Sequence, residues 1–279
     1  MVDTIAKKRF HRGLLYLVVI TLSLIFLMPG LWTFSNSLRD IYSISQIIPT
    51  SIHWENFKMA LTLVPYLEYV KNSFIISGIT VLLTTISSAL VGFGFARLRA
   101  PGKNVLFFII IATMMLPGIV TQVPTYILFS RIGLTNSFLP WVFWGMGGNA
   151  FLIFLYRQFF MNIPVEIDEA AKLDGCSTLG IFLRMYLPLS IPVITTVMVM
   201  SFQGSWGDYQ TPFMFLDSDK WNLATAMISS NYSLPNNPSI QLIPVINAAT
   251  LLFAIPIIVT FFIGQKYLVE GIVTTGLKG

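Results

Sequence analysis

Four long segments of this sequence contain no charged residue, and their length limits what the chain can fold into. Each is predominantly apolar and 25 to 27 residues long, whereas about 20 apolar residues cross a bilayer as a helix. Over the whole chain only 10% of residues are charged, far below the quarter or so of a water-soluble domain. The pattern predicts a membrane protein, and the segments are residues 13–38, 72–96, 104–130 and 132–156.

Two further segments are long enough to cross a bilayer but are less regular. Residues 185–216 contain a single charge, Asp208, and residues 221–265 are charge-free with a polar, proline-rich first half. Only the second half of the latter, Ile240 to Gln265, is apolar enough to span. We therefore expect an all-α integral membrane protein with six transmembrane helices, near residues 13–34, 72–96, 105–129, 138–158, 189–214 and 242–266.

The basic residues indicate how these helices are oriented. Lys and Arg near helix ends stay on the cytoplasmic side, and 12 of the 17 basic residues lie there if the N-terminus is cytoplasmic. We expect a cytoplasmic N-terminus at residues 1–12, a six-helix domain at 13–268 and a cytoplasmic tail at 269–279. This topology accounts for the net charge of +5 and leaves little support for a nucleic-acid partner.

The predicted spans hold few groups that could carry out chemistry. Asp208 is the one carboxylate inside a span, and both histidines, His11 and His53, lie outside. The single cysteine, Cys176, can form neither an internal disulfide nor a cysteine cluster for a metal. The chain also has no Gly-x-x-x-x-Gly-Lys-Ser/Thr loop for a nucleotide. These features predict a non-catalytic chain without a metal site, driven by another chain if transport is active.

Polar residues between two prolines mark the third predicted span as irregular. Pro117 and Pro124 flank Thr121 and Gln122. Proline removes a backbone donor and kinks a helix, and polar groups at membrane depth need water or a protein partner. The pattern predicts a locally irregular helix that lines a water-filled space.

Residues 162–192, between the fourth and fifth spans on the expected cytoplasmic side, contain two short amphipathic pieces. The first begins near Pro164, carries acidic residues in its first turn and is expected to stop at Gly175. Residues 177–178 can cap the second piece, whose apolar residues recur at a spacing of three and four. Such an elbow can transmit motion to a soluble partner or lie on lipid headgroups, and composition leaves both open.

The spacing of residues within this elbow favours the soluble partner. It resembles the EAA loop of ATP-binding-cassette (ABC) importer permeases: Glu169-Ala170-Ala171, three residues, Gly175, nine residues, then Met185-Tyr186-Leu187-Pro188. Met185 stands where the family pattern has a branched aliphatic residue. Other blocks resemble the carbohydrate importers, and most of all the second permease of the maltose type. These blocks are residues 36–39, 117–124, 133–137 and 271–279.

The resemblance implies a type I ABC importer permease fold and a transmembrane permease subunit of an ATP-driven, binding-protein-dependent importer of a sugar or oligosaccharide. It implies as partners a second homologous permease, two ATPase subunits that bind ATP and Mg, and an extracellular or periplasmic solute-binding protein. This chain then holds no cofactor and spans the inner membrane of a bacterial cell several times. The implied contacts with the ATPase, through the coupling (EAA) loop 162–192, are Glu169, Ala170, Ala171, Asp174, Gly175, Leu179, Phe182, Leu187 and Pro188, with Leu179 and Phe182 as apolar anchors.

Polar and aromatic groups inside the spans are candidates for the cargo path, because sugars are held by aromatic faces and hydrogen-bonding groups. The same groups could instead bond helix to helix at the interface with the partner permease. The family usually has Trp-Asn-Asp/Glu where Trp206-Gly207-Asp208 stands, which leaves the inherited role of this position open. The candidates are Gln122, Asn149, Gln203, Trp206, Asp208 and Tyr209.

Three questions stay open at this level. A neutral oligosaccharide, a sugar alcohol, a glycerol-phosphate compound or an anionic uronate oligomer would all fit the family. The outer loops 35–71 and 217–239 are either docking surfaces for the binding protein or ordinary solvated loops. An ATPase-independent channel or facilitator is the alternative function, and the elbow motif argues against it.

Overall fold

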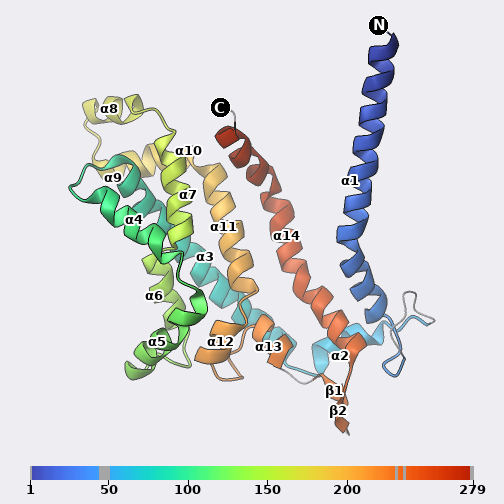
Figure 1. Cartoon of the computed structure of the whole chain (residues 1–279). Helices are drawn as coiled ribbons and strands as arrows, with labels where there is room; N and C mark the ends of the chain where they lie inside the picture. The colour runs from blue at the N-terminus through green and yellow to red at the C-terminus, as the bar shows by residue number, and fades with distance from the viewer. Residues whose placement is uncertain (1, 44–50, 230–231, 235–236, 277–279) are drawn as a thin grey trace. The chain divides into compact units, whose positions relative to one another are not determined.

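The computed structural model describes residues 2–43, 51–229, 232–234 and 237–276, and most of these residues are helical (Figure 1). The chain divides into two compact units. The first comprises Met1–Tyr66 and Asn231–Leu252, and the second comprises Leu67–Ser230 and Phe253–Gly279.

The first unit consists of one long apolar helix and several short elements. Its turn-forming sequence at 236–238 falls partly outside the described residues, and Asn237 begins a strand. The two strands pair antiparallel, with Ser233 opposite Gln241. The elements are α1 (Val2–Ser37), α2 (Glu55–Thr62), β1 (Ser233–Leu234), β2 (Asn237–Gln241) and the first part of α14 (Ile243–Gly276).

A buried asparagine holds the end of α1. The Asn56 side chain donates hydrogen bonds to the carbonyl oxygens of Ser37, at 2.8 Å, and Arg39, at 2.7 Å. The backbone N–H of His53 donates to the Leu38 carbonyl at 2.8 Å. Carbonyls at a helix end lack partners inside the helix, so these bonds give the described part of loop 35–71 a defined structure.

The second unit contains the remaining helices and one turn of π-helix. Helix α3 begins one residue before it, at Tyr66. The elements are α3 (Tyr66–Arg97), α4 (Lys103–Thr113), α5 (Gly118–Arg131), α6 (Leu139–Gly147), α7 (Ala150–Met161), α8 (Glu166–Leu173), α9 (Thr178–Ile181), the π-helix η1 (Phe182–Tyr186), α10 (Leu187–Leu189), α11 (Ile191–Trp206), α12 (Gln210–Phe215), α13 (Leu223–Ser229) and the rest of α14.

Four described helices are long and apolar enough to cross a bilayer, and two bent pairs bring the number to six if each pair forms one span. The bent pairs are α4 with α5, at 99°, and α9–α10 with α11, at 79°. Helix α14 extends to Gly276, so most of the expected tail 269–279 is helical, and residues 277–279 lie outside the described part. The four single helices are His11–Ser37, Tyr66–Arg97, Leu139–Met161 and Ile243–Tyr267.

The third predicted span breaks where the prolines indicated irregularity. Helix α4 ends at Thr113, and α5 begins at Gly118 directly after Pro117. Proline disfavours a helical backbone in the residue before it, which favours a break there. Pro124 stays inside α5. The expected irregularity is confirmed, and it divides the predicted span 105–129 into two helices that are bent by 99°.

The fifth span also departs from its prediction as one helix over 189–214. Helix α11 ends at Trp206, and α12 starts at Gln210. Asp208 causes the restart, because its Oδ1 accepts the backbone N–H of Gln210 and of Thr211, each at 3.1 Å. A short acidic side chain that bonds nearby backbone donors favours a new helix start over continuation.

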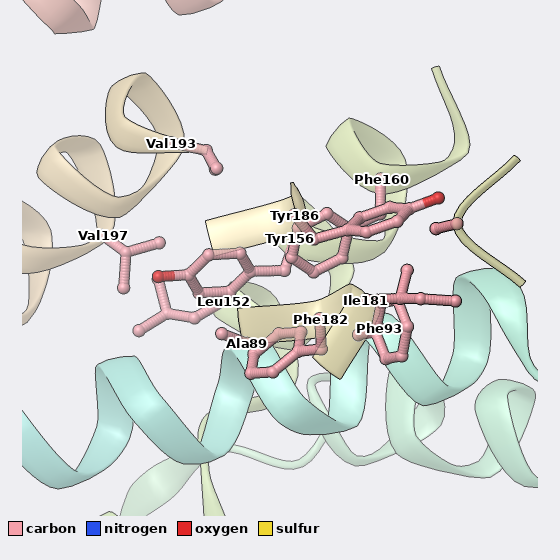
Figure 2. Close-up of a cluster of buried hydrophobic side chains, with 11 residues drawn as sticks. Ala89, Phe93, Leu152, Tyr156, Phe160, Ile181, Phe182, Tyr186, Val193 and Val197 are labelled. Atoms are coloured by element: carbon pink, nitrogen blue, oxygen red, sulfur yellow. The ribbon is translucent and has the colours of Figure 1, made fainter. Parts of the chain in front are cut away.

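An aromatic cluster forms one of two hydrophobic cores in the described part of the second unit (Figure 2). Phe93 of α3 lies with its ring centroid 4.9 Å from that of Tyr186 in η1. Tyr156 and Phe160 of α7 stack at 5.6 Å. The cluster joins three membrane helices to the elbow, and its buried members are Ala89, Phe93, Leu152, Tyr156, Phe160, Ala171, Ile181, Phe182, Tyr186, Val193 and Val197.

Close approach of α3 and α7 depends on Gly92. A Cβ added there would lie 2.6 Å from the Tyr156 Cβ and 3.2 Å from the Arg157 nitrogen. We expect Gly92→Ala to lower the free energy of unfolding by about 1–3 kcal/mol, as overpacked cores do. Thermal unfolding of the detergent-solubilised protein measures this.

Gly94→Ala is the matched control, because its added Cβ would meet only the Leu98 Cδ1 at 4.0 Å. This change should leave stability unchanged or raise it by up to about 1 kcal/mol, since Ala is the better helix former. Equal stability of the Gly92 and Gly94 variants would contradict the close crossing.

Candidate functional site

The elbow begins with a helix whose ends are defined as the sequence predicted. Helix α8 carries acidic residues in its first turn. Gly175 has a φ of +79°, and its N–H donates to the Lys172 carbonyl at 3.0 Å. The Cys176 N–H donates to the Ala171 carbonyl at 2.9 Å. These two bonds form a Schellman stop, which requires a left-handed residue and so favours glycine. The predicted stop at Asp174-Gly175 is confirmed.

The second half of the elbow contains a π-helical turn before Pro188. Ser177 caps it by accepting the Gly180 N–H at 3.1 Å. The Leu187 N–H then donates to the Phe182 carbonyl, a bond across five residues. Pro188 has no N–H of its own and its ring would crowd the preceding turn, so the wider turn accommodates it. Turns of this kind redirect side chains.

The predicted spacing placed the apolar residues of the second piece on one face, but the structure buries some of them and exposes others. Leu179 and Leu183 are exposed, whereas Phe182 and Tyr186 are buried in the aromatic cluster. Phe182 is 3% exposed, so the expectation that it anchors the elbow to an ATPase is wrong. It anchors the elbow to α3 and α7 of its own chain. The other predicted contact residues Glu169, Ala170, Asp174, Gly175 and Pro188 are exposed, Leu187 is half-buried and Ala171 is buried.

A buried ion pair ties α8 to the end of α3. The Asp168 Oδ2 lies 3.8 Å from the Arg97 Nε, and both side chains are about nine-tenths buried. The Tyr186 hydroxyl donates to the Asp168 Oδ1 at 2.6 Å, and the Arg97 guanidinium lies 5.2 Å above the Tyr186 ring. Arg97 also donates to the Ile163 carbonyl. We call Arg97, Asp168 and Tyr186 the clamp.

Sequence reasoning missed the clamp as a unit. It assigned Arg97 to topology, Asp168 to the helix dipole and Tyr186 to an apolar face. One signal was available: Asp168 lies one residue before Glu169 on α8, so the two acidic residues cannot occupy the same face.

The second unit also contains a partly open cavity of about 630 Å³, within the range of small-molecule sites. It brings together Gln122, Asn149 and Asp208 of the six predicted path residues. Residues that the sequence did not single out complete the wall. The lining is Thr80, Thr84, Gly118, Thr121, Gln122, Thr125, Trp141, Trp144, Gly145, Gly148, Asn149, Phe151, Leu152, Met200, Ser201, Gly204, Ser205, Asp208, Thr211 and Phe215.

The other three predicted path residues do not line this cavity. Trp206 is fully buried, and its indole N–H donates to the Phe253 carbonyl at 3.1 Å. This contact is helix packing between α11 and α14. Tyr209 is 46% exposed, and Gln203 is half-buried on another face of α11.

Two of the polar cavity residues already have structural partners. Asn149 caps α7 by accepting the N–H of Phe151 and of Leu152, at 3.0 and 3.2 Å, and Asp208 caps α12. By contrast, Gln122 Oε1, Ser201 Oγ and Ser205 Oγ are buried atoms without a hydrogen-bond partner among the described residues. No group of three or more His, Cys, Asp or Glu side chains that could hold a metal exists within the described part of the chain.

Comparison with known proteins gives this geometry its context. Residues 88–273, two thirds of the chain, match the model of the binding-protein-dependent transport system inner membrane component. The chain belongs to this family. The resemblance inferred from the EAA spacing is confirmed, and the family is one of transport permeases located in a membrane.

Individual relatives match over nearly their whole length. The probable ABC transporter permease protein YurM of Bacillus subtilis is 31% identical, with 95% of this chain and 86% of that protein covered. The maltose/maltodextrin transport system permease protein MalG of Salmonella typhimurium is 30% identical, with 96% and 95% covered.

The fold also matches a solved structure. One chain of a bacterial ABC transporter involved in the import of the acidic polysaccharide alginate superposes with a TM-score of 0.79 at 22% identity, covering 93% of this chain and 96% of that one. The predicted fold class, an all-α membrane permease of the ABC importer type, is confirmed, with one short hairpin added.

Proposed function

We propose that this chain is one permease subunit of an ATP-driven, binding-protein-dependent importer of a sugar or oligosaccharide. Its family supports the transport role, and relatives named as maltodextrin permeases support the cargo class. The partners are a second homologous permease, two ATPase subunits and an external solute-binding protein. The ATPase subunits bind ATP and Mg, and this chain is non-catalytic.

The observation that carries this proposal is the elbow, which is packed against its own chain on one face and carries exposed leucines on the other. Its buried face joins α3, α7 and α11 through the aromatic cluster. Its exposed face presents Glu169 and three leucines, of which Leu173 is 89%, Leu179 58% and Leu183 50% exposed. Apolar side chains on a stiff helix pair suit docking into a groove of a soluble protein. We assign this face to the ATPase subunit.

This assignment places the elbow and both chain termini in the cytoplasm. The N-terminal segment 1–12, the span-containing domain 13–268 and the tail 269–279 keep the topology expected from the basic residues. An ATPase-independent channel has no soluble subunit for the exposed face of the elbow to bind. The elbow therefore favours the importer over the channel.

The start of loop 217–239 supports a role at the opposite side of the membrane. The Asn72 side chain donates to the carbonyls of Asp219, at 3.2 Å, and Trp221, at 3.1 Å. Lys220 Nζ donates to the Asn136 carbonyl at 2.8 Å. These bonds hold the base of the loop against α3 and the α5–α6 connection. A loop held at its base suits docking of the solute-binding protein.

Reconstitution tests the function directly. The chain is placed in lipid with a candidate partner permease, ATPase and binding protein from the same organism, and ATP hydrolysis is measured across a panel of neutral and acidic oligosaccharides. We expect a stable complex whose ATPase rate rises when binding protein and one sugar class are both present. Failure to assemble with any ATPase would favour the channel.

A further inference from the structure

The cavity of the second unit carries almost no charge. Asp208 is the one ionisable side chain among its described lining residues, which include no Lys, Arg or His. We infer that this cavity is a binding subsite for an uncharged sugar ring, and that it disfavours uronates. The inference rests on the proposed importer function and adds the class of cargo and the residues that contact it.

Unpartnered polar atoms point to a ligand rich in hydroxyl groups. Gln122 on α5 and Ser201 and Ser205 on α11 each place an oxygen in buried surroundings without a partner among the described residues. Ser205 is only 9% exposed. Leaving such a group unsatisfied costs about 1–3 kcal/mol. These three oxygens have almost no accessible surface in this structure, so each side chain must turn toward the cavity to bind. Sugar hydroxyls can then donate to the Gln122 carbonyl and both donate to and accept from the serines.

The opposite requirement of a sugar, an apolar face, is met by Trp144, which is half-buried, whereas the neighbouring Trp141 and Phe215 belong to a buried core and are 5% and 2% exposed. Trp141 and Trp144 of α6 lie edge to face at 5.6 Å, and Phe215 of α12 lies 5.2 Å from Trp144. All three line the cavity. Ligand sites typically combine such apolar walls with a few placed polar groups, and the C–H faces of a sugar ring fit this wall.

The charge of the cavity selects against acidic sugars. A carboxylate moved out of water needs a cation or several donors to offset its desolvation. The described lining supplies no cation and one carboxylate of like charge, Asp208. The similar proteins leave the charge of the cargo open, since one matched transporter imports an acidic polysaccharide and one relative is a maltodextrin permease. The inference of a neutral cargo therefore rests on the lining of the cavity.

Titration of the purified complex with sugars, without binding protein, tests the inference. The signal is tryptophan emission, and the probes are maltotriose, cellotriose and trigalacturonate. We expect a saturable change with at least one neutral probe and none with trigalacturonate. Trp144→Phe should remove most of the signal, because that ring lines the cavity. Gln122→Ala and Ser205→Ala should each weaken binding by up to about tenfold, the effect of one lost hydrogen bond.

Two variants sharpen the result. Gln158→Ala makes the same change on α7 outside the cavity and should bind as the wild type does. Asp208→Asn keeps a side-chain oxygen for the α12 cap but removes the charge, so trigalacturonate binding should become measurable.

Each failure has a distinct meaning. Trigalacturonate binding as tightly as the neutral probes would overturn the charge inference. A preparation whose ATPase responds to binding protein, but whose neutral-probe signal is absent or unaffected by Gln122→Ala and Ser205→Ala, would overturn the subsite and leave the importer standing. Absence of any ATPase association would instead reject the proposed function.

Discussion

Replacing Asp168 by Ala is expected to destabilise the protein by about 3–5 kcal/mol, the cost of leaving a buried charge without its partner. Arg97 would remain buried, at 11% side-chain exposure, and Tyr186 would lose its acceptor. The elbow would also lose its ionic tie to α3, while the packing of Phe93 on Phe182 and Tyr186 remains. We therefore expect both a lower unfolding midpoint in detergent and a weaker dependence of ATP hydrolysis on binding protein.

A double variant separates the charge from the shape of the clamp. Arg97→Met with Asp168→Leu removes both charges while keeping similar volume, and such replacements are often neutral or stabilising. Stability should largely return. Coupling should stay impaired if the clamp also holds the direction of the elbow, because packing alone lacks the Arg97–Asp168 ion pair and the hydrogen bond from Tyr186 to Asp168.

An exposed ion pair on the same helix is the control. Glu68 and Lys71 lie 3.7 Å apart on α3, with both side chains about two-thirds exposed. Glu68→Ala should change stability by less than about 1 kcal/mol, as exposed pairs do. If Asp168→Ala costs no more than Glu68→Ala, the clamp is not a stabilising joint.

Replacing Gly175 by Pro is expected to uncouple ATP hydrolysis from uptake. Proline fixes φ near −65° and has no N–H, whereas Gly175 has a φ of +79° and donates to the Lys172 carbonyl. The Schellman stop cannot form, so α8 changes direction relative to α9. With about 3 kcal/mol or more of strain at this turn, we expect uptake per ATP hydrolysed to fall by about tenfold or more.

Two companions make this result specific to the elbow. Gly175→Asn should retain most of the coupling, because Asn tolerates the left-handed conformation. Gly133→Pro changes another turn with a φ of +72° and an N–H bond, to the Ser130 carbonyl at 3.1 Å, and should spare the ratio of uptake to hydrolysis. Normal uptake per ATP in Gly175→Pro would reject the coupling assignment.

Local features of the elbow could be read from the sequence because they depend on neighbouring residues. The acidic first turn of α8 and the stop at Gly175 involve groups within about one helical turn. The break at Pro117 is likewise a steric effect on the adjacent residue. The break at Asp208 was missed, although it is also local, because an apolar run with one charge resembles a continuous span.

Which side chains face inward was decided by tertiary structure. The π-turn before Pro188 buries Phe182 and exposes Leu183, and a spacing rule for ideal helices cannot anticipate it. The cavity is another case. Its polar walls come from helices separated by about 80 residues, such as Gln122 on α5 and Ser205 on α11.

The sequence by itself determined that the chain crosses a membrane, where its apolar spans lie and which segment forms the elbow. These properties follow from apolar length and local backbone chemistry, which hold for any arrangement of the helices. Only the tertiary structure joined Arg97 to Asp168 and separated Trp206 from the cavity. Pairing of distant residues depends on how helices cross, and that is set by packing over the whole unit.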